Sequence, residues 1–436
     1  MSETPRSKPQ TKITTVARHG RLKKTNPWAN AAKIVASALA VVLVSGAIVG
    51  GVAVWDVAAS VKPGVALVDT TPGEPLPAIG AYPGGVNLLI VGSDSRAGQD
   101  PIFGGEDETG VLNDVTMLLH ISEDHSNATV VSFPRDMFVA IPSCPDPEGG
   151  SFNAMSRQKI NTSLGYGGLA CTALTVSELT GLEIPFAAEV QFSGVMSMSS
   201  ALGGVTVCVA DPIEDEHTGT FLSAGEHSLE GFAALQFLRT RHGVGDGSDL
   251  SRISNQQVFL SAMMQKVKSA ETLTNPGTVY SLAKAAAKSM QLSESLTSID
   301  TIAAIGLTLK DVDLANIAFV QYPNAPVEGG VEPITSAATA LFDALKADQP
   351  IKLTGNTGTG SVTASSGAQT PVEGEVAAPP AGADGATAEN GAGDAAASTD
   401  ASAGVVAGGA VVLPTSVQGQ TADQRTCSKG RTLDDQ

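Results

Sequence analysis

Arginine and aspartate residues gather in one segment of this acidic sequence. The chain has 26 Lys+Arg against 44 Asp+Glu and a formal net charge of −18. The segment FLRTRHGVGDGSDLSRISNQQ, residues 237–257, nevertheless contains Arg239, Arg241, Asp249 and Arg252. Guanidinium groups bind phosphate oxygens through paired hydrogen bonds. Several arginines close together therefore indicate a phosphate-rich ligand such as a pyrophosphate.

Other charged and polar residues follow short apolar segments elsewhere in the chain. They are Asp94, Arg96, Asp114, Arg135, Asp136, Lys159, Asn161 and Gln256. Two carboxylates that share a divalent ion would neutralise a pyrophosphate and polarise its leaving phosphate. A further carboxylate could accept the proton of an attacking hydroxyl. Phosphoryl transfer depends mainly on positioning and charge stabilisation, which this set of residues can supply.

Each of these residues has a simpler explanation when it is taken alone. Arg135 and Asp136 could form an ordinary surface salt bridge. Arg239 and Arg241 could stabilise the C-terminus of a helix. The joint pattern is harder to explain in this way, because it places many charged residues at the ends of apolar segments. Spacing alone leaves both interpretations open.

Several other functional classes find no support in the sequence. It has no Gly-x-Ser-x-Gly motif, no Walker loop and no His/Cys pattern with metal-ligand spacing. Nucleic-acid binding requires a basic face, which a chain of this net charge does not suggest.

The order of predicted elements indicates an α/β domain over residues 84–350. Strands are predicted for VNLLIV, DVTMLLHI, ATVVSF and 316–322, and residues 186–209 are predicted as strand, helix, Gly-Gly turn and strand. Helices are predicted at 228–241 with Ser228 as N-cap, from Ser254, and at 278–290, 298–309 and 336–348. Charged groups at the strand ends would face a ligand at the edge of the sheet.

The N-terminal region predicts a single membrane anchor. Residues 34–55 form an uncharged apolar run, long enough to cross the ~30 Å hydrocarbon core. Eight Lys or Arg residues precede it, which predicts a basic cytoplasmic segment at 1–33 and an extracytoplasmic domain. The alternative is a cleaved signal peptide, whose apolar region is normally only ~7–15 residues long. Pro- and Gly-rich residues 56–83 are predicted as a spacer.

The C-terminal region is of low complexity but contains one of the four cysteines. Residues 351–436 are rich in Gly, Ala, Thr and Ser, and predict a disordered low-complexity tail. Four cysteines in an exported domain make disulfides plausible. Cys144 and Cys171 are the first candidate pair. Cys208 would then pair with Cys427 and tether the last residues to the domain, or one or both of these stay free.

Seven motifs make the chain resemble the LytR–CpsA–Psr family of membrane-anchored cell-wall polymer ligases. They occur in the family's order over most of residues 84–260: VGSDSR, NDVTML, SFPRD, KINTSLGYGG, LGGV, LEGFAALQFLRTR and DLSRISNQQ. The resemblance implies an α-β-α sandwich with a central mixed sheet and a hydrophobic channel for a lipid chain. It also implies transfer of a glycan from a polyprenyl-pyrophosphate carrier to peptidoglycan through a phosphodiester bond.

The resemblance also assigns expected roles to the residues. Asp94 and Asp114 match the ligands of Mg2+, for which Mn2+ is an alternative. The residues that match pyrophosphate-binding arginines are Arg135, Arg239, Arg241 and Arg252. Asp249 matches a base or an arginine-orienting group, and the expected substrate-binding residues are Arg96, Asp136, Lys159, Asn161 and Gln256. Asn255 stands where many members have arginine, so one phosphate contact could be missing here.

The paired cysteines, the Ala-rich composition and the tail resemble actinobacterial members, for which arabinogalactan is the preferred glycan. A pyrophosphatase that acts on the same lipid would need the same residues. A non-catalytic receptor for wall glycan or lipid is a further alternative. These three functions differ in their products rather than in their sequence motifs.

Overall fold

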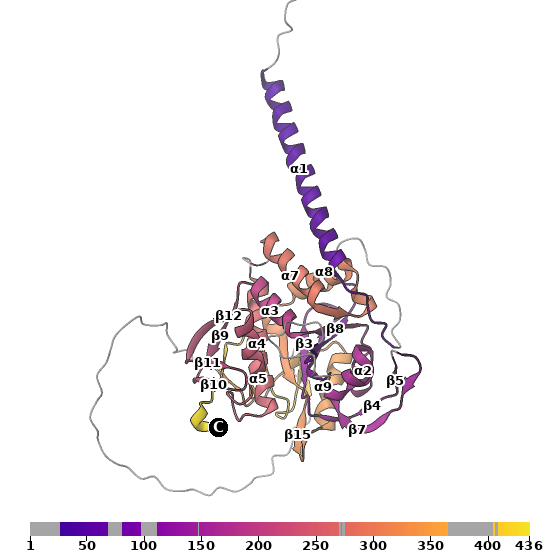
Figure 1. The fold of residues 1–436 in the computed structure, drawn as a ribbon, viewed down its shortest axis with the longest axis vertical. Coiled ribbons are helices and arrows are strands. Elements are labelled where there is room, and N and C mark those ends of the chain that lie inside the picture. The colour runs from indigo at the N-terminus through magenta and orange to yellow at the C-terminus, as the bar shows by residue number, and fades with distance from the viewer. Residues whose placement is uncertain are drawn as a thin grey trace, which may run out of the picture. The chain divides into compact units, whose positions relative to one another are not determined.

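The computed structural model describes residues 27–68, 81–96, 111–146, 148–269, 272, 275–364, 404–405 and 409–436. The chain divides into two units, residues 1–55 and 56–436. Figure 1 shows the elements of both units, coloured from indigo at the N-terminus to yellow at the C-terminus.

One helix in the described part of the chain, α1 (Pro27–Ser60), is long and apolar enough to cross a membrane. The predicted span at 34–55 lies inside it, and its side chains are almost all exposed. A helix that is apolar on all sides and unburied by protein suits a lipid environment. This fits a single-pass membrane protein. The predicted basic segment falls mostly on residues 1–26, outside the described residues.

The second unit is built around a mixed sheet in the order β13-β8-β1-β2-β3-β14-β21. The strands are β1 (Val86–Ser93), β2 (Asn113–Ile121), β3 (Ala128–Phe133), β8 (Phe186–Val190), β13 (Met290–Leu292), β14 (Ile317–Gln321) and β21 (Gly419–Thr421). β1 runs parallel to β8, and β3 parallel to β14, while the other neighbours are antiparallel. The predicted central mixed sheet is therefore confirmed.

Helices cover both faces of this sheet. On one face, α2 (Ser163–Thr180) and α9 (Thr335–Lys346) pack against Leu89, Leu118 and Val131. On the other, α5 (Asp249–Lys268) and α8 (Ile299–Asp311) pack near Met117 and Leu119. Strands buried on both faces read as continuous apolar runs, which is why VNLLIV and ATVVSF could be recognised as strands.

A second sheet has the order β12-β9-β22-β18. Its strands are β12 (Gly225–Leu229), β9 (Val205–Val209), β22 (Thr426–Ser428) and β18 (Ser361–Thr363). Val207 and Val209 share a core with Phe237 of α4 (Phe232–Arg239) and Phe259 of α5. Two further helices, α3 (Phe192–Ala201) and α7 (Pro276–Ser289), pack against each other.

The remaining elements are short. The paired strands are β4 (Phe138–Ile141) with β7 (Met155–Lys159), β5 (Cys144–Pro145) with β6 (Ser151–Phe152), β10 (Ile213–Asp215) with β11 (Thr220–Leu222), β15 (Asn324–Val327) with β16 (Gly330–Pro333), and β20 (Val411–Val412) with β17 (Ile351–Lys352) and β19 (Gly404–Val405). The 3-10 turns are η2 (Ile160–Thr162), η3 (Glu294–Leu296), η4 (Leu314–Asn316) and η5 (Leu433–Asp435).

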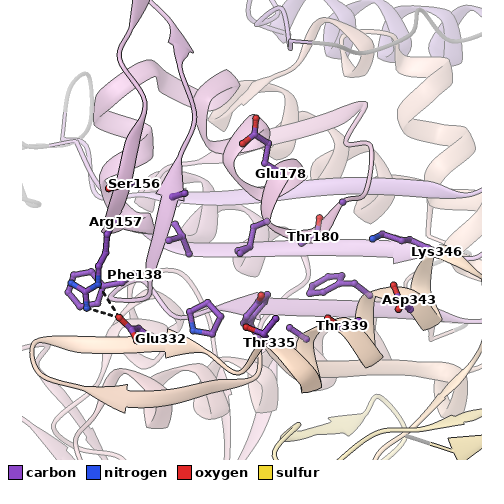
Figure 2. A pocket seen from close by; sticks show the side chains of 18 residues that line it. Phe138, Ser156, Arg157, Glu178, Thr180, Glu332, Thr335, Thr339, Asp343 and Lys346 are labelled. Atoms are coloured by element: carbon purple, nitrogen blue, oxygen red, sulfur yellow. Dashed lines mark hydrogen bonds and ion pairs between the residues drawn. The ribbon is translucent and has the colours of Figure 1, made fainter.

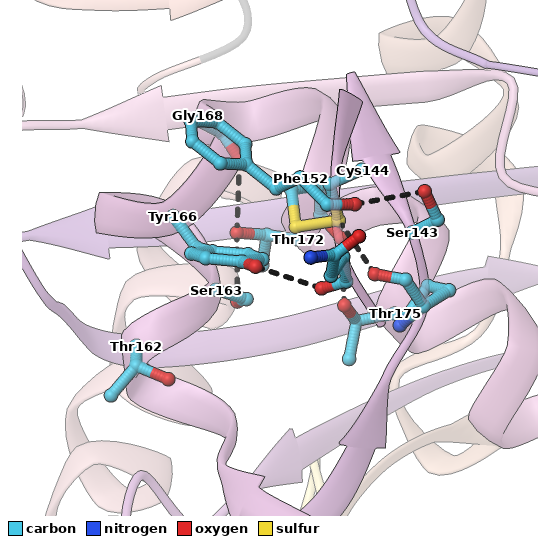
Figure 3. The surroundings of a disulfide bond; sticks show 12 residues. Ser143, Cys144, Phe152, Thr162, Ser163, Tyr166, Gly168, Thr172 and Thr175 are labelled. Atoms are coloured by element: carbon cyan, nitrogen blue, oxygen red, sulfur yellow. Dashed lines mark hydrogen bonds between the residues drawn. A yellow bond between two sulfur atoms is a disulfide. The ribbon is translucent and has the colours of Figure 1, made fainter. Parts of the chain in front are cut away.

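A disulfide joins Cys144 of β5 to Cys171 of α2, as predicted (Figure 3). Gly167 lies beside it, and a Cβ there would stand 2.8 Å from the Cβ of Cys171 and 3.0 Å from the Cβ of Cys144. Only glycine fits such an approach without displacement. The rings of Phe152 and Tyr166 pack 4.6 Å apart at the same place. The disulfide therefore fixes the start of α2 against the β5–β6 hairpin.

The C-terminal region departs from the sequence prediction, which ends the domain at residue 350. Residues 351–364 and 409–436 belong to the fold, and 365–403 lie outside the described residues. β21 pairs with β14, β22 pairs with β9, and a disulfide joins Cys208 to Cys427. These strands are only two or three residues long, so they carry no apolar pattern of their own. They depend on strand edges that other segments supply.

Three local differences also separate prediction and structure. Ser228 lies in β12 rather than at a helix N-cap, because α4 begins only at Phe232. α5 begins at Asp249, where Ser248 accepts a hydrogen bond from the Ser251 N–H (3.2 Å). The predicted spacer 56–83 is partly structured, since Val65 hydrogen-bonds to Leu292 (2.9 Å), while its residues 69–80 lie outside the described part.

Candidate active site

The predicted residues meet at one edge of the central sheet. β1 and β3 are both antiparallel to β2, so they run in the same direction and end at the same edge. Asp94 follows β1, Arg135 follows β3, and Asp114 is the second residue of β2, which begins there. Asp249 reaches this edge from the first turn of α5. The sheet topology thus explains how residues 155 positions apart come together.

Asp249 and Asp114 hold two arginines in a network of alternating charges. Arg135 Nη1 lies 2.6 Å from Asp114 Oδ1, and Arg252 Nη2 lies 2.6 Å from Asp249 Oδ1. Asp249 Oδ1 is also 3.6 Å from Arg135 Nε, and its Oδ2 accepts the Arg135 backbone N–H (3.3 Å). Arg252 Nη2 donates to the backbone oxygen of Asp114 (2.8 Å). Asp249 therefore orients both arginines.

The network favours the charged form of Arg135. Burial lowers the pKa of Arg135, but its hydrogen bond to Asp114 and the charges of Asp114, Asp249 and Asp136 outweigh burial and raise the pKa above its ordinary value. Charged hydrogen bonds of this kind are short and strong. The guanidinium is consequently held in one place before any ligand arrives.

Arg239 has a different environment. Its guanidinium carbon lies 4.6 Å from the centre of the Phe192 ring, and no carboxylate in the described part of the chain forms an ion pair with it. Burial lowers the pKa of Arg239, and the positive charges of Arg96 and Arg252 lower it further. The negative charges of Asp114 and Asp94 oppose this effect but do not outweigh it. A half-buried cation among other cations favours binding of an anion.

A second ion pair extends the cluster. Lys159 Nζ lies 2.8 Å from Asp136 Oδ1, and Asp136 Oδ2 is 3.6 Å from Arg135 Nε. The backbone N–H of Asn161 donates to the Arg135 oxygen (3.2 Å). Its side-chain Oδ1 is buried and has no hydrogen-bond partner among the described residues. Asn161 thus supports the backbone that carries Arg135.

Asp94 and Asp114, the residues expected to bind a metal ion, lie close enough for their charges to interact. Asp94 Oδ1 accepts the backbone N–H of Leu112 (2.7 Å). Burial raises the pKa of Asp94, and the negative charge of Asp114 raises it further. A divalent cation would relieve this repulsion, and Mg2+ is often bound by one or two carboxylates plus waters and phosphate oxygens. The described residues contain no group of three or more His, Cys, Asp or Glu side chains that could hold a metal ion.

Arg241 forms no side-chain ion pair within the described residues, and its backbone is anchored instead. Its backbone N–H donates to Asp215 Oδ2 (3.2 Å), which also accepts the Thr240 hydroxyl (2.7 Å). Arg241 Nε is buried and finds no hydrogen-bond partner in the part of the chain that is described. Arg96 lies three residues after the end of β1, near enough to Arg239 for their charges to interact. Sequence analysis missed Asp215 and also Phe192, because neither stands beside the motif it supports.

An apolar cavity of about 270 Å³ adjoins the charged cluster. Asp114, Arg239, Arg252 and Gln256 line it together with apolar side chains such as Met117, Phe192, Val195, Met198, Phe259 and Met263. Gln256 Nε2 donates to the Leu238 oxygen (3.0 Å). Val195 and Met198 both belong to α3, so this helix forms part of the cavity wall. The cavity can accept a hydrocarbon chain with its charged end at the arginines.

Asn255 has a role that sequence analysis did not foresee. It is fully buried, donates to the Phe237 oxygen (2.8 Å) and accepts the hydroxyl hydrogen of Ser428 from β22. The residue that replaces arginine therefore joins the C-terminal strand to α5. Neither of these two hydrogen bonds involves a residue of the charged cluster.

The sequence model of the LytR_cpsA_psr family matches residues 68–348, more than half of the chain. The chain belongs to this family. Among its relatives, the cell wall biosynthesis protein LcpA of Corynebacterium glutamicum is 28% identical over 57% of this chain and 52% of its own length. The probable cell wall biosynthesis protein LcpB of the same organism is 31% identical, over 62% of this chain and 64% of its own length.

A third family member is the polyisoprenyl-teichoic acid–peptidoglycan teichoic acid transferase TagT of Bacillus subtilis. It is 26% identical over 53% of this chain and 70% of its own length. The chain thus spans about half to two thirds of the length of the two corynebacterial relatives.

Proposed function

We propose that this LytR_cpsA_psr protein transfers a cell-wall glycopolymer from a polyprenyl-pyrophosphate carrier to peptidoglycan. The acceptor hydroxyl would attack the phosphorus next to the glycan. A phosphodiester bond forms, the bond to the bridging oxygen breaks, and polyprenyl phosphate leaves. The names of TagT and of the corynebacterial relatives support this class of reaction.

The observation that carries the proposal is the position of Arg239. It lines the apolar cavity and lacks a carboxylate partner in the described part of the chain, while Arg135 and Arg252 beside it are oriented by Asp249. A polyprenyl pyrophosphate has the matching shape, with an apolar chain and a compact anion at its end. Preorganised cations stabilise the charge that builds up on the phosphate oxygens during transfer.

Asp249 acts in this proposal as an orienting group. Its carboxylate forms ion pairs with the guanidinium groups of Arg135 and Arg252 and so fixes their positions. Lys159 and Asp136 form an ion pair that extends the charged cluster beyond Arg135.

Asp94 and Asp114 are proposed to hold Mg2+, with Mn2+ as a substitute. The raised pKa of Asp94 reflects burial and the neighbouring carboxylate, which a cation would offset. The ion would neutralise the pyrophosphate and polarise the leaving phosphate. The remaining ligands would be waters and phosphate oxygens.

Arabinogalactan is the proposed glycan, because the corynebacterial relatives are cell wall biosynthesis proteins. The proposed topology places residues 1–33 in the cytoplasm and the domain outside, in keeping with the eight basic residues before the apolar run. Two disulfides support an oxidising compartment. Pyrophosphatase activity and receptor function remain the two competing functions.

The test uses the full-length protein in detergent micelles, with a polyprenyl-pyrophosphate oligosaccharide, Mg2+ and a peptidoglycan fragment. We expect a phosphodiester-linked product that Arg239→Ala reduces about 100-fold or more. Arg425→Ala is the matched control, since Arg425 is exposed and pairs with Glu226 away from the cluster. Free glycan phosphate without ligated product would identify a pyrophosphatase. Donor binding without turnover would identify a receptor.

A further inference from the structure

We propose that an open cleft between α2, α9 and the β4–β7 hairpin binds the acceptor, a peptidoglycan strand with its stem peptide. This inference rests on the proposed function and adds a site for the second substrate. The cleft has a volume of about 650 Å³ and shares no lining residue with the apolar cavity. Figure 2 shows Arg157 and Glu332 at one end of the cleft and Lys346 and Asp343 at the other.

The lining of the cleft suits a polar ligand that carries both signs of charge. Five hydroxyl-bearing side chains line it, namely Ser156, Thr180, Tyr322, Thr335 and Thr339. Two cationic and three acidic side chains line it as well, namely Arg157, Lys346, Glu178, Glu332 and Asp343. Sugar hydroxyls and a stem peptide with ammonium and carboxylate groups match this mixture. A polyanionic polymer or a lipid chain matches less well, because the lining carries more acidic than cationic side chains and is only partly apolar.

Tyr322 forms a rigid part of the wall of the cleft. It is 2% exposed, and burial raises the pKa of Tyr322 to about 12. Its ring packs against Phe133 and Phe342 at centroid distances of 5.2 Å and 5.6 Å. This side of the cleft is therefore held in place by an aromatic core.

A row of contacts leads from the cleft to the charged cluster. The guanidinium of Arg157 is held by Glu332 (2.8 Å) and lies over the Phe138 ring, 3.8 Å from its centre. Lys159 Nζ lies 5.9 Å from the centre of the same ring and 2.8 Å from Asp136 Oδ1. Asp136 Oδ2 in turn lies 3.6 Å from Arg135 Nε. The side chains at this end of the cleft are thus direct neighbours of the charged cluster.

The cleft and the apolar cavity lie on opposite faces of the central sheet. Tyr322 and Phe342 of the cleft share the core with α2 and α9. Ile90 and Met117 of the cavity share the core on the other face, near α5. Attacking and leaving oxygens must be roughly in line at the phosphorus. Entry of donor and acceptor from opposite faces would meet this requirement at the edge of the sheet where the arginines lie.

The test is a blocking substitution in full-length protein, Thr339→Trp, with Ser336→Trp as the matched control. Both residues are exposed on α9, but only Thr339 lines the cleft. We expect Thr339→Trp to raise the KM for a disaccharide–pentapeptide acceptor about tenfold or more, with the donor KM changed less than about twofold. The control should leave both constants within about twofold, and both variants should keep the wild-type Tm.

A second measurement separates this inference from the proposed function. Isothermal titration of the same disaccharide–pentapeptide into the protein needs no turnover. If the wild type transfers glycan but Thr339→Trp leaves acceptor KM and binding unchanged, the cleft is not the acceptor site. If the wild type shows no transfer, the proposed function fails, and binding that Thr339→Trp abolishes would still place the peptidoglycan fragment in the cleft. Absence of binding to the wild type would overturn the inference.

Discussion

Removal of the Cys208–Cys427 disulfide is expected to cost more stability than removal of Cys144–Cys171. The two bonds close loops of very different length, with sequence separations of 219 and 27. Loop-closure entropy in the unfolded chain predicts losses of about 5.4 and about 3.6 kcal/mol, respectively. The expected difference in the free energy of unfolding is therefore about 2 kcal/mol. It comes only from the dependence of the entropy on the logarithm of loop length, since the constant contribution is the same for both bonds.

The comparison is made between two double alanine variants, so that each loses the same two sulfur atoms. Cys144, Cys171 and Cys427 are buried and Cys208 is half-buried, so lost packing should not favour the larger loss expected without Cys208 and Cys427. Urea titration of the full-length protein in detergent, followed by circular dichroism, would give both free energies of unfolding. Tryptophan fluorescence would not serve, because both tryptophans, Trp28 and Trp55, lie in α1.

The result that would refute this reasoning is an equal or larger loss in the variant without Cys144 and Cys171. Such a result would mean that local contacts of the β5–β6 hairpin and α2 outweigh loop entropy. The variant without Cys208 and Cys427 should still fold, because β22 remains paired with β9 and β18.

Two further predictions concern the charged cluster. The pKa of Asp94 is higher in the folded than in the unfolded state, first because of burial and then because of the charge of Asp114. Ionisation of Asp94 therefore destabilises the metal-free fold at neutral pH. This destabilisation disappears as the pH falls below the unfolded pKa. Asp94→Asn should therefore raise the metal-free Tm near pH 7 but not in acid. The same substitution should abolish any increase in Tm on adding Mg2+. Calorimetry at both pH values measures these changes. Asp249→Ala should lower the free energy of unfolding by about 3 kcal/mol, because it leaves two largely buried arginines without their shared partner. Urea titration measures that loss, and a change below about 1 kcal/mol would contradict the role given to Asp249.

The parts of the fold that could be predicted from sequence are those with local patterns. Strands such as VNLLIV are buried on both faces and read as apolar runs, and the helices at 278–290, 298–309 and 336–348 correspond to α7, α8 and α9. The segment SFPRD placed Arg135 and Asp136 directly after a strand, which was enough to predict their position at the sheet edge. Both disulfide pairings are also confirmed.

What could not be predicted depends on contacts between distant segments. Asp215 is far from the motif that contains Arg241, and only the fold brings its carboxylate to the Arg241 backbone. Asn255 looked like a lost phosphate contact, whereas its amide bonds to Ser428 of a strand with no apolar pattern. Cys427 was the one feature of the last residues that indicated a place in the fold.

The position of β21 sets an order of events during synthesis. β14 ends at residue 321, but the strand that covers its outer edge begins at residue 419. At about 5–20 residues per second, the ribosome needs about 5–20 s to make the chain between them. β14 and the edge of β9 stay uncovered during that interval and are available to other strands. A chaperone therefore has this interval in which to bind the uncovered strand edges, and a pause in elongation would lengthen it.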